Sequence, residues 1–155
     1  SNINLEGNWN NSGTYTYNAG DIVSFDGSSN STITGATDWY VLNANNSGGV
    51  TVSSGNQNIY FALDIDQGAF DANSNTVTLI SDASGTAVLS DIGTGSYSGN
   101  LTVQRFVNEG NGWYLLASPL TGADLEDWNG ESDMTGFTGT ELPSYSFKSV
   151  QSKGL

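Results

Sequence analysis

The sequence has no cysteine and no histidine, and its three cationic side chains face 16 acidic ones, for a net charge of -13. Without cysteine there are no disulfides, thiolate metal clusters or thiol nucleophiles. Without histidine the commonest general base and metal ligand is missing. With so few cations the chain has no basic face for phosphate groups, so we expect no nucleic-acid partner. It also lacks a run of about 20 apolar residues, so we expect no direct membrane insertion.

Strong helix-forming stretches are also scarce. Gly, Ser, Asn and Thr make up nearly half of the 155 residues, and these residue types favour turns over helix interiors. The chain is nevertheless not of the disordered kind, because 36% of its residues are apolar and 11% are aromatic. A length of 155 residues fits one ordinary domain. The composition therefore predicts a folded, all-β chain.

Short segments in which apolar and polar residues alternate recur along the chain, and clusters of Asn, Gly and Ser separate them. Strands are expected to begin about every 8–12 residues, a spacing shared by sandwiches, barrels and solenoids. The expected strands cover residues 14–17, 22–26, 31–34, 39–43, 50–53, 59–66, 76–81 and 86–90.

The shortness of these strands and their Gly-Asn-Ser corners favour the coils of a solenoid. Residues 13–17, 49–53 and 75–79 share one pattern, a turn residue followed by alternating threonine and apolar residues. We predict a short-stranded parallel β-solenoid over residues 1–99, and a β-sandwich is the alternative.

The pattern changes near residue 100. Residues 101–107 form a longer alternating segment, and residues 112–119 follow a Glu-Gly-Asn-Gly turn, which predicts an antiparallel hairpin. We therefore expect a small antiparallel C-terminal part over residues 100–155. Because this part ends without an evident final element, we expect the chain to be a segment of a longer protein.

Residues 7–13 are G-N-W-N-N-S-G, residues 42–52 are L-N-A-N-N-S-G-G-V-T-V, and residues 112–122 are G-W-Y-L-L-A-S-P-L-T-G. These segments resemble the coils, and the segment that ends them, of secreted bacterial β-solenoid surface proteins exported by the type IX secretion pathway. The resemblance covers roughly residues 5–128. It implies an extracellular, cell-surface location and a structural or adhesive role, and it carries over no catalytic residue.

Asp64, Asp66 and Asp71 are the candidate metal ligands. Calcium takes about six to eight oxygen ligands, often from Asp-rich loops that contain glycine, and Gly68 lies within this segment. The apolar residues that alternate with these acids indicate a strand with a solvated acidic face instead. We expect no obligatory cofactor, and calcium is the candidate ion.

The candidate carbohydrate-binding residues are Trp9, Tyr15, Tyr17, Trp39 and Tyr40. Exposed aromatic rings beside Asn and Asp side chains suit neutral sugars, because one end of each ring is apolar and the other is polar. The alternative is that Trp9 caps the first coil and the other rings pack in the core.

Catalysis is the weakest hypothesis, because the acidic residues 126–133 lack any cationic or histidine partner nearby. We predict a non-catalytic, extracellular structural or adhesive module. It would be a stalk segment of a surface protein or a filament subunit that associates end to end with neighbouring copies. The alternative is a carbohydrate-binding module for neutral glycans that uses exposed aromatics.

Overall fold

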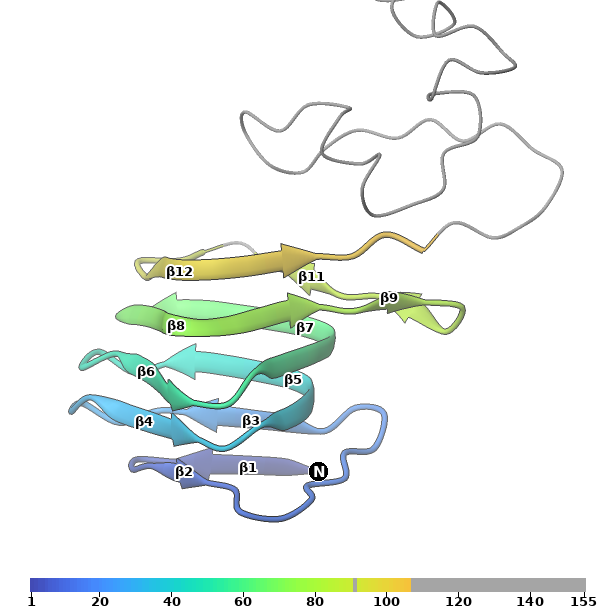
Figure 1. Ribbon diagram of the computed structural model, residues 1–155. Coiled ribbons are helices and arrows are strands. Elements are labelled where there is room, and N and C mark those ends of the chain that lie inside the picture. Colours follow the sequence, from blue (N-terminus) through green and yellow to red (C-terminus); the bar gives the residue numbers. More distant parts are fainter. Residues whose placement is uncertain (91, 107–155) are drawn as a thin grey trace, which may run out of the picture. The chain divides into compact units, whose positions relative to one another are not determined.

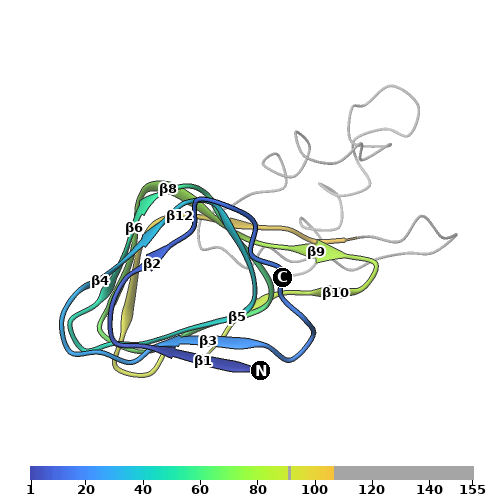
Figure 2. The ribbon, with the colours of Figure 1, turned by 90° about the horizontal axis from the view of Figure 1, so that it is seen from below.

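The computed structural model describes residues 1–90 and 92–106, which lie in one compact unit of the chain. These residues form a parallel β-solenoid of about 5 turns (Figure 1). The predicted fold class is thus confirmed. Seen along the solenoid axis, the coils are triangular (Figure 2), so each coil contributes strands to three faces.

The first face contains the strands that open each coil. Its parallel ladder runs from β1 through β3, β5 and β7 to β11. Its strands are β1 (Asn2–Leu5), β3 (Ile22–Phe25), the second half of β5 (Thr37–Asn45), the second half of β7 (Gln57–Gln67) and β11 (Val88–Leu89).

The second and third faces are built in the same parallel way. Register pairs join β2, β4, β6, β8 and β12 on the second face, and the remaining halves of the long strands on the third. The strands introduced here are β2 (Trp9–Asn10), β4 (Ser31–Thr34), β6 (Val50–Ser54), β8 (Ala69–Leu79) and β12 (Ser96–Val103).

Alternation in the sequence becomes a stacked core. Phe25, Ala44 and Ile65 occupy the same register position in successive coils, and all three are buried. Trp39 and Ile59 stack in the same way on the third face. Because like positions stack, each inward side chain covers the one below it, and burying such side chains is the main favourable term in folding.

The corners of the coil require glycine at particular positions. Gly35 has a φ of +92° and Gly68 a φ of +74°, in the left-handed region that favours glycine. A Cβ atom at Gly35 would overlap the backbone oxygen of Asn11, and one at Gly68 would overlap that of Asn46. Adjacent coils therefore approach too closely at these corners for any side chain.

The predicted strand over residues 14–17 is wrong, because this segment forms no strand, although Tyr15 packs against the core. Residues 101–103 belong to β12, which runs parallel to β8, so this segment continues the parallel stacking. The predicted antiparallel hairpin joins residues 101–107 to residues 112–119, and that pairing stays a prediction because residues 112–119 are not among those described. Residue 91 and residues 107–155, with the rest of that predicted part and residues 126–133, lie outside the described residues.

An antiparallel pair does occur, but between two coils. β9 (Ser81–Asp82) pairs with β10 (Gly85–Thr86), and this hairpin replaces the corner that leads from β8 to β11. Figure 2 shows the hairpin projecting outward from the triangular coil, and β10 lies in contact with β7.

Candidate functional site

Four aromatic side chains gather on the outside of the solenoid where the third face turns into the first. They are Tyr17, Tyr40, Tyr60 and Phe61, and together we name them the aromatic corner. The ring centroids of Tyr17 and Tyr60 lie 5.0 Å apart, and those of Tyr17 and Tyr40 lie 6.0 Å apart. Tyr40 and Phe61 are stacked with centroids 5.0 Å apart and an interplanar angle of 11°.

A β-bulge creates the most exposed part of the aromatic corner. Trp39 pairs with Ile59 and Val41 pairs with Ala62, so β7 carries one residue more than β5 between these pairs. Ile59 and Ala62 are buried, and the two residues between them turn outward together. Phe61 is 53% exposed as a result. Bulges commonly redirect a side chain at functional sites in this way.

Carboxylates flank the aromatic rings. The Asp38 carboxylate accepts a hydrogen bond of 2.8 Å from the Asn58 side-chain amide, and Asp82 lies on the hairpin. Burial raises the pKa of Tyr17 and of Tyr60, and the negative charges of Asp38 and Asp82 raise both pKa values further. The rings therefore lie in a negative potential that disfavours anions.

A depression of about 230 Å³ has Asp38 in its lining, and none of the four rings of the aromatic corner lines it. Its other lining residues include Asn11, Tyr15 and Thr37. The Thr37 hydroxyl accepts hydrogen bonds from the Trp9 indole at 3.2 Å and from the Asn11 amide at 3.0 Å. These bonds hold the wall of the depression in place.

The structure separates the five predicted carbohydrate-binding aromatics into two groups. Tyr17 and Tyr40 belong to the aromatic corner. Trp9, Tyr15 and Trp39 pack together at the N-terminal end of the core, with centroids 4.9–5.9 Å apart. Trp39 is fully buried, so the prediction that it belongs to an exposed strip is wrong. The reason is strand geometry, because consecutive residues such as Trp39 and Tyr40 point to opposite faces.

Tyr60 and Phe61 are the members of the aromatic corner that the sequence analysis missed. A signal was present, since Asp38, Trp39 and Tyr40 are followed 20 residues later by Asn58, Ile59 and Tyr60. A coil repeat of that length places Tyr40 and Tyr60 at the same corner of successive turns.

The three candidate metal ligands are not brought together. Asp66 accepts a hydrogen bond of 2.8 Å from the Asn43 amide, and Asp71 accepts one of 3.0 Å from the Ser98 hydroxyl. Asp64 lies on β7 beside Asn43. Residues 1–90 and 92–106 contain no group of three or more His, Cys, Asp or Glu side chains arranged to hold a metal ion.

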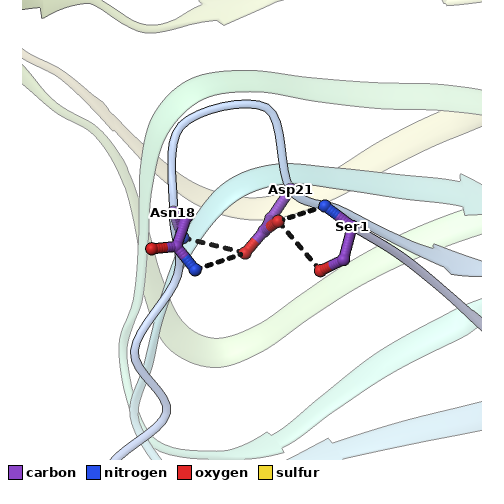
Figure 3. Close-up of polar contacts among 3 residues, drawn as sticks. All are labelled: Ser1, Asn18 and Asp21. Carbon is purple, nitrogen blue, oxygen red and sulfur yellow. Dashed lines mark hydrogen bonds and ion pairs between the residues drawn. The ribbon is translucent and has the colours of Figure 1, made fainter.

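A further carboxylate is buried in the turn that leads into β3. Asp21 pairs with the N-terminal amine and hydroxyl of Ser1 and accepts the Asn18 backbone amide at 2.8 Å (Figure 3). The cationic amine, the Asn18 amide and the Ser1 hydroxyl hold the pKa of Asp21 well below its ordinary value. Both oxygens of this carboxylate accept hydrogen bonds, so Asp21 fixes the turn and is not a reactive group.

Comparison with known protein families, characterised proteins and solved structures finds no match to this chain. Among residues 1–90 and 92–106 there is no helix long and apolar enough to cross a membrane.

Proposed function

We propose that this chain is a non-catalytic structural module of an extracellular surface protein. The observation that carries the proposal is the unbroken parallel ladder that joins each coil to the next over the described residues. In a ladder of this kind the stability of each coil depends only on its contacts with neighbouring coils. A spacer can therefore be lengthened by adding coils.

Hydrogen bonding at the corners of the coils supports the same structural role. Gln57 and Asn46 are fully buried, and their side chains bond to backbone groups of adjacent coils. In the described part of the chain no buried side-chain nitrogen or oxygen lacks a hydrogen-bond partner. A completely satisfied interior rigidifies a structure, and rigidity is what a stalk needs.

The resemblance of several segments to type IX-exported surface solenoids supports the extracellular location that we propose. Antibodies raised against the chain test it on cells of the source organism. We expect labelling of intact cells, with an antibody to a cytoplasmic protein as the negative control. Labelling that requires permeabilisation would contradict the proposal.

The size of the native protein separates the two forms of this role. A parent chain far above 16.2 kDa would favour a stalk segment, and a polymer of 16.2 kDa chains would favour a filament subunit. For a filament, the open edge of β1 is the surface we propose for end-to-end contact, because in the described residues β1 pairs only with β3.

A matched pair of variants tests that edge. Asn4→Lys places a charge on β1, and Ser24→Lys places one on β3, at the register position that pairs with Asn4. Charged side chains on an edge strand oppose pairing with another chain. In a filament, Asn4→Lys should reduce polymer mass while Ser24→Lys should not. Equal polymer mass in both variants would exclude β1 as the contact.

A further inference from the structure

The aromatic corner occupies the same corner of three successive coils. Tyr17 ends the first coil, Tyr40 the second, and the Tyr60–Phe61 bulge the third. Coils are spaced by about 4.8 Å, yet the rings of Tyr17 and Tyr60, from the first and third coils, lie only 5.0 Å apart. The four rings therefore form one compact cluster that spans these coils. On the next coil this position is taken by the β9–β10 hairpin, which bounds the cluster at one end.

Large apolar side chains stay exposed at and beside the aromatic corner. Phe61 and Val88 are two of the large hydrophobic side chains that remain about half exposed, and Val88 pairs with Ala62, the residue after Phe61. The apolar strip therefore continues from the aromatic corner onto the next coil. An apolar strip of this kind with polar groups at its border is typical of a binding surface.

The polar border specifies the ligand chemistry. The Asn58 amide holds one oxygen of Asp38, and the other oxygen can accept a hydrogen bond from a hydroxyl group. One oxygen of Asp82 accepts the backbone amides of Ser84 and Gly85, which leaves its second oxygen for a hydroxyl donor. The three phenol groups of the tyrosines add donors and acceptors at the edges of the rings. A net charge of -13 opposes any anionic ligand. Flat apolar rings bordered by hydroxyl acceptors match the two surfaces of a sugar ring, its CH face and its hydroxyl rim.

We propose that the aromatic corner binds a neutral oligosaccharide. Phe61, which is 53% exposed, supplies the stacking surface, and Tyr40 supports that ring by stacking against it with centroids 5.0 Å apart. Because the apolar strip continues from Phe61 to Val88, a second sugar ring contacts it. Asp38 accepts sugar hydroxyls. This site does not depend on the stalk role, since it needs only the folded coils.

The test measures sugar affinity of the full chain by titration calorimetry. The neutral probes are cellotetraose, xylotetraose, mannotetraose and chitotetraose. Oligogalacturonate serves as the anionic probe and choline as the cationic one. We expect one or more neutral tetrasaccharides to bind, with oligogalacturonate and choline binding more weakly or not at all. The matching monosaccharide should bind more weakly than its tetrasaccharide, because it covers only one part of the apolar strip.

Three variants locate the site. Phe61→Ala removes the stacking surface, Tyr40→Ala removes the ring that supports it, and Phe106→Ala removes another exposed phenylalanine outside the aromatic corner. Truncating a central aromatic of an interface typically weakens binding about tenfold or more, so we expect that loss for the first two variants and none for Phe106→Ala. Thermal melts establish that all three variants remain folded.

Several results would overturn the proposal. They are the absence of binding to every neutral probe, tighter binding of choline or oligogalacturonate, and unchanged affinity in folded Phe61→Ala and Tyr40→Ala. Equal affinity for a monosaccharide and its tetrasaccharide would overturn the contact of a second sugar ring with the apolar strip.

Discussion

The indole N–H of Trp39 donates a hydrogen bond of 2.9 Å to the side-chain oxygen of Gln57 inside the core. Both side chains are fully buried, and the Gln57 amide nitrogen donates in turn to the backbone oxygens of Gly35 and Gly55 at 3.1 and 2.7 Å. The Gln57 side chain thus joins Trp39, the largest fully buried side chain, to a corner formed by two stacked coils. The corner and the core are consequently stabilised together.

Replacing Gln57 by leucine should lower the free energy of unfolding by about 2–4 kcal/mol, because it leaves the Trp39 N–H and two carbonyl oxygens without this partner. Urea denaturation at neutral pH measures the change. Asn58→Ala is the matched control, since it removes an amide on the solvent side of the same strand and should cost about 1 kcal/mol or less. Equal losses in both variants would contradict a structural role for the buried network.

Gly35→Ala should destabilise the solenoid by about 2 kcal/mol or more, through the left-handed backbone and the overlap of its Cβ with Asn11. At Gly85, on the hairpin, a Cβ would meet no atom within 4 Å. Gly85→Ala should therefore change stability by no more than about 0.5 kcal/mol. Thermal melts of the two variants check this difference, and a Gly35→Ala variant as stable as Gly85→Ala would show that the corner can widen.

Asp21 should make stability depend on pH at the acidic end. Its pKa is lowered in the folded state, so its contribution is present above its ordinary pKa of 3.8 and is lost as the pH falls through the lower folded-state value. Asp21→Asn in the chain with a free Ser1 amine should lower the melting temperature at pH 7, and the gap to the unmodified chain should narrow as the pH falls below 3.8.

The control for this effect is Asp26→Asn, which changes an exposed carboxylate at the end of β3. It should leave the melting temperature nearly unchanged at pH 7. A gap between Asp21→Asn and the unmodified chain that stays constant down to pH 2 would contradict the coupling between Asp21 and Ser1.

The Tyr97 hydroxyl should ionise at a higher pH than an ordinary tyrosine hydroxyl. Burial raises its pKa to about 12, with a further contribution from the charge of Asp71, and its hydroxyl donates a hydrogen bond of 2.8 Å to the Asn100 carbonyl. The raised value means that its contribution to stability is present below pH 10 and is lost as the pH rises toward 12. The phenolate absorbance lost in Tyr97→Phe should therefore titrate near pH 12. A midpoint near pH 10 would contradict the partial burial of this hydroxyl.

Calcium should not act through the acidic residues of β7 and β8. Asp66 and Asp71 already accept hydrogen bonds, and the three carboxylates do not form one ligand group. The triple variant Asp64→Asn, Asp66→Asn, Asp71→Asn should show the same change in melting temperature on adding calcium as the unmodified chain. A calcium-dependent rise that disappears in the triple variant would restore this segment as a metal site.

The candidate site was only partly predictable. Tyr17 and Tyr40 were identified from aromatic residues beside polar ones, and both belong to the aromatic corner. Trp39 was placed with them because the sequence does not say which phase of an alternation faces the core. Phe61 was missed because its exposure depends on a bulge, and a bulge is visible only when two strands are paired.

The sequence by itself determined the all-β class and favoured a parallel solenoid over a sandwich, because alternation and turn residues are local properties. Only the tertiary structure decided the direction of Leu101–Val103 and the meeting of Tyr17 with Tyr60. Both depend on register between coils, and register is set by how stacked side chains fill a shared core. The same packing placed Trp39 inside and Tyr40 outside, and so separated the core from the proposed binding surface.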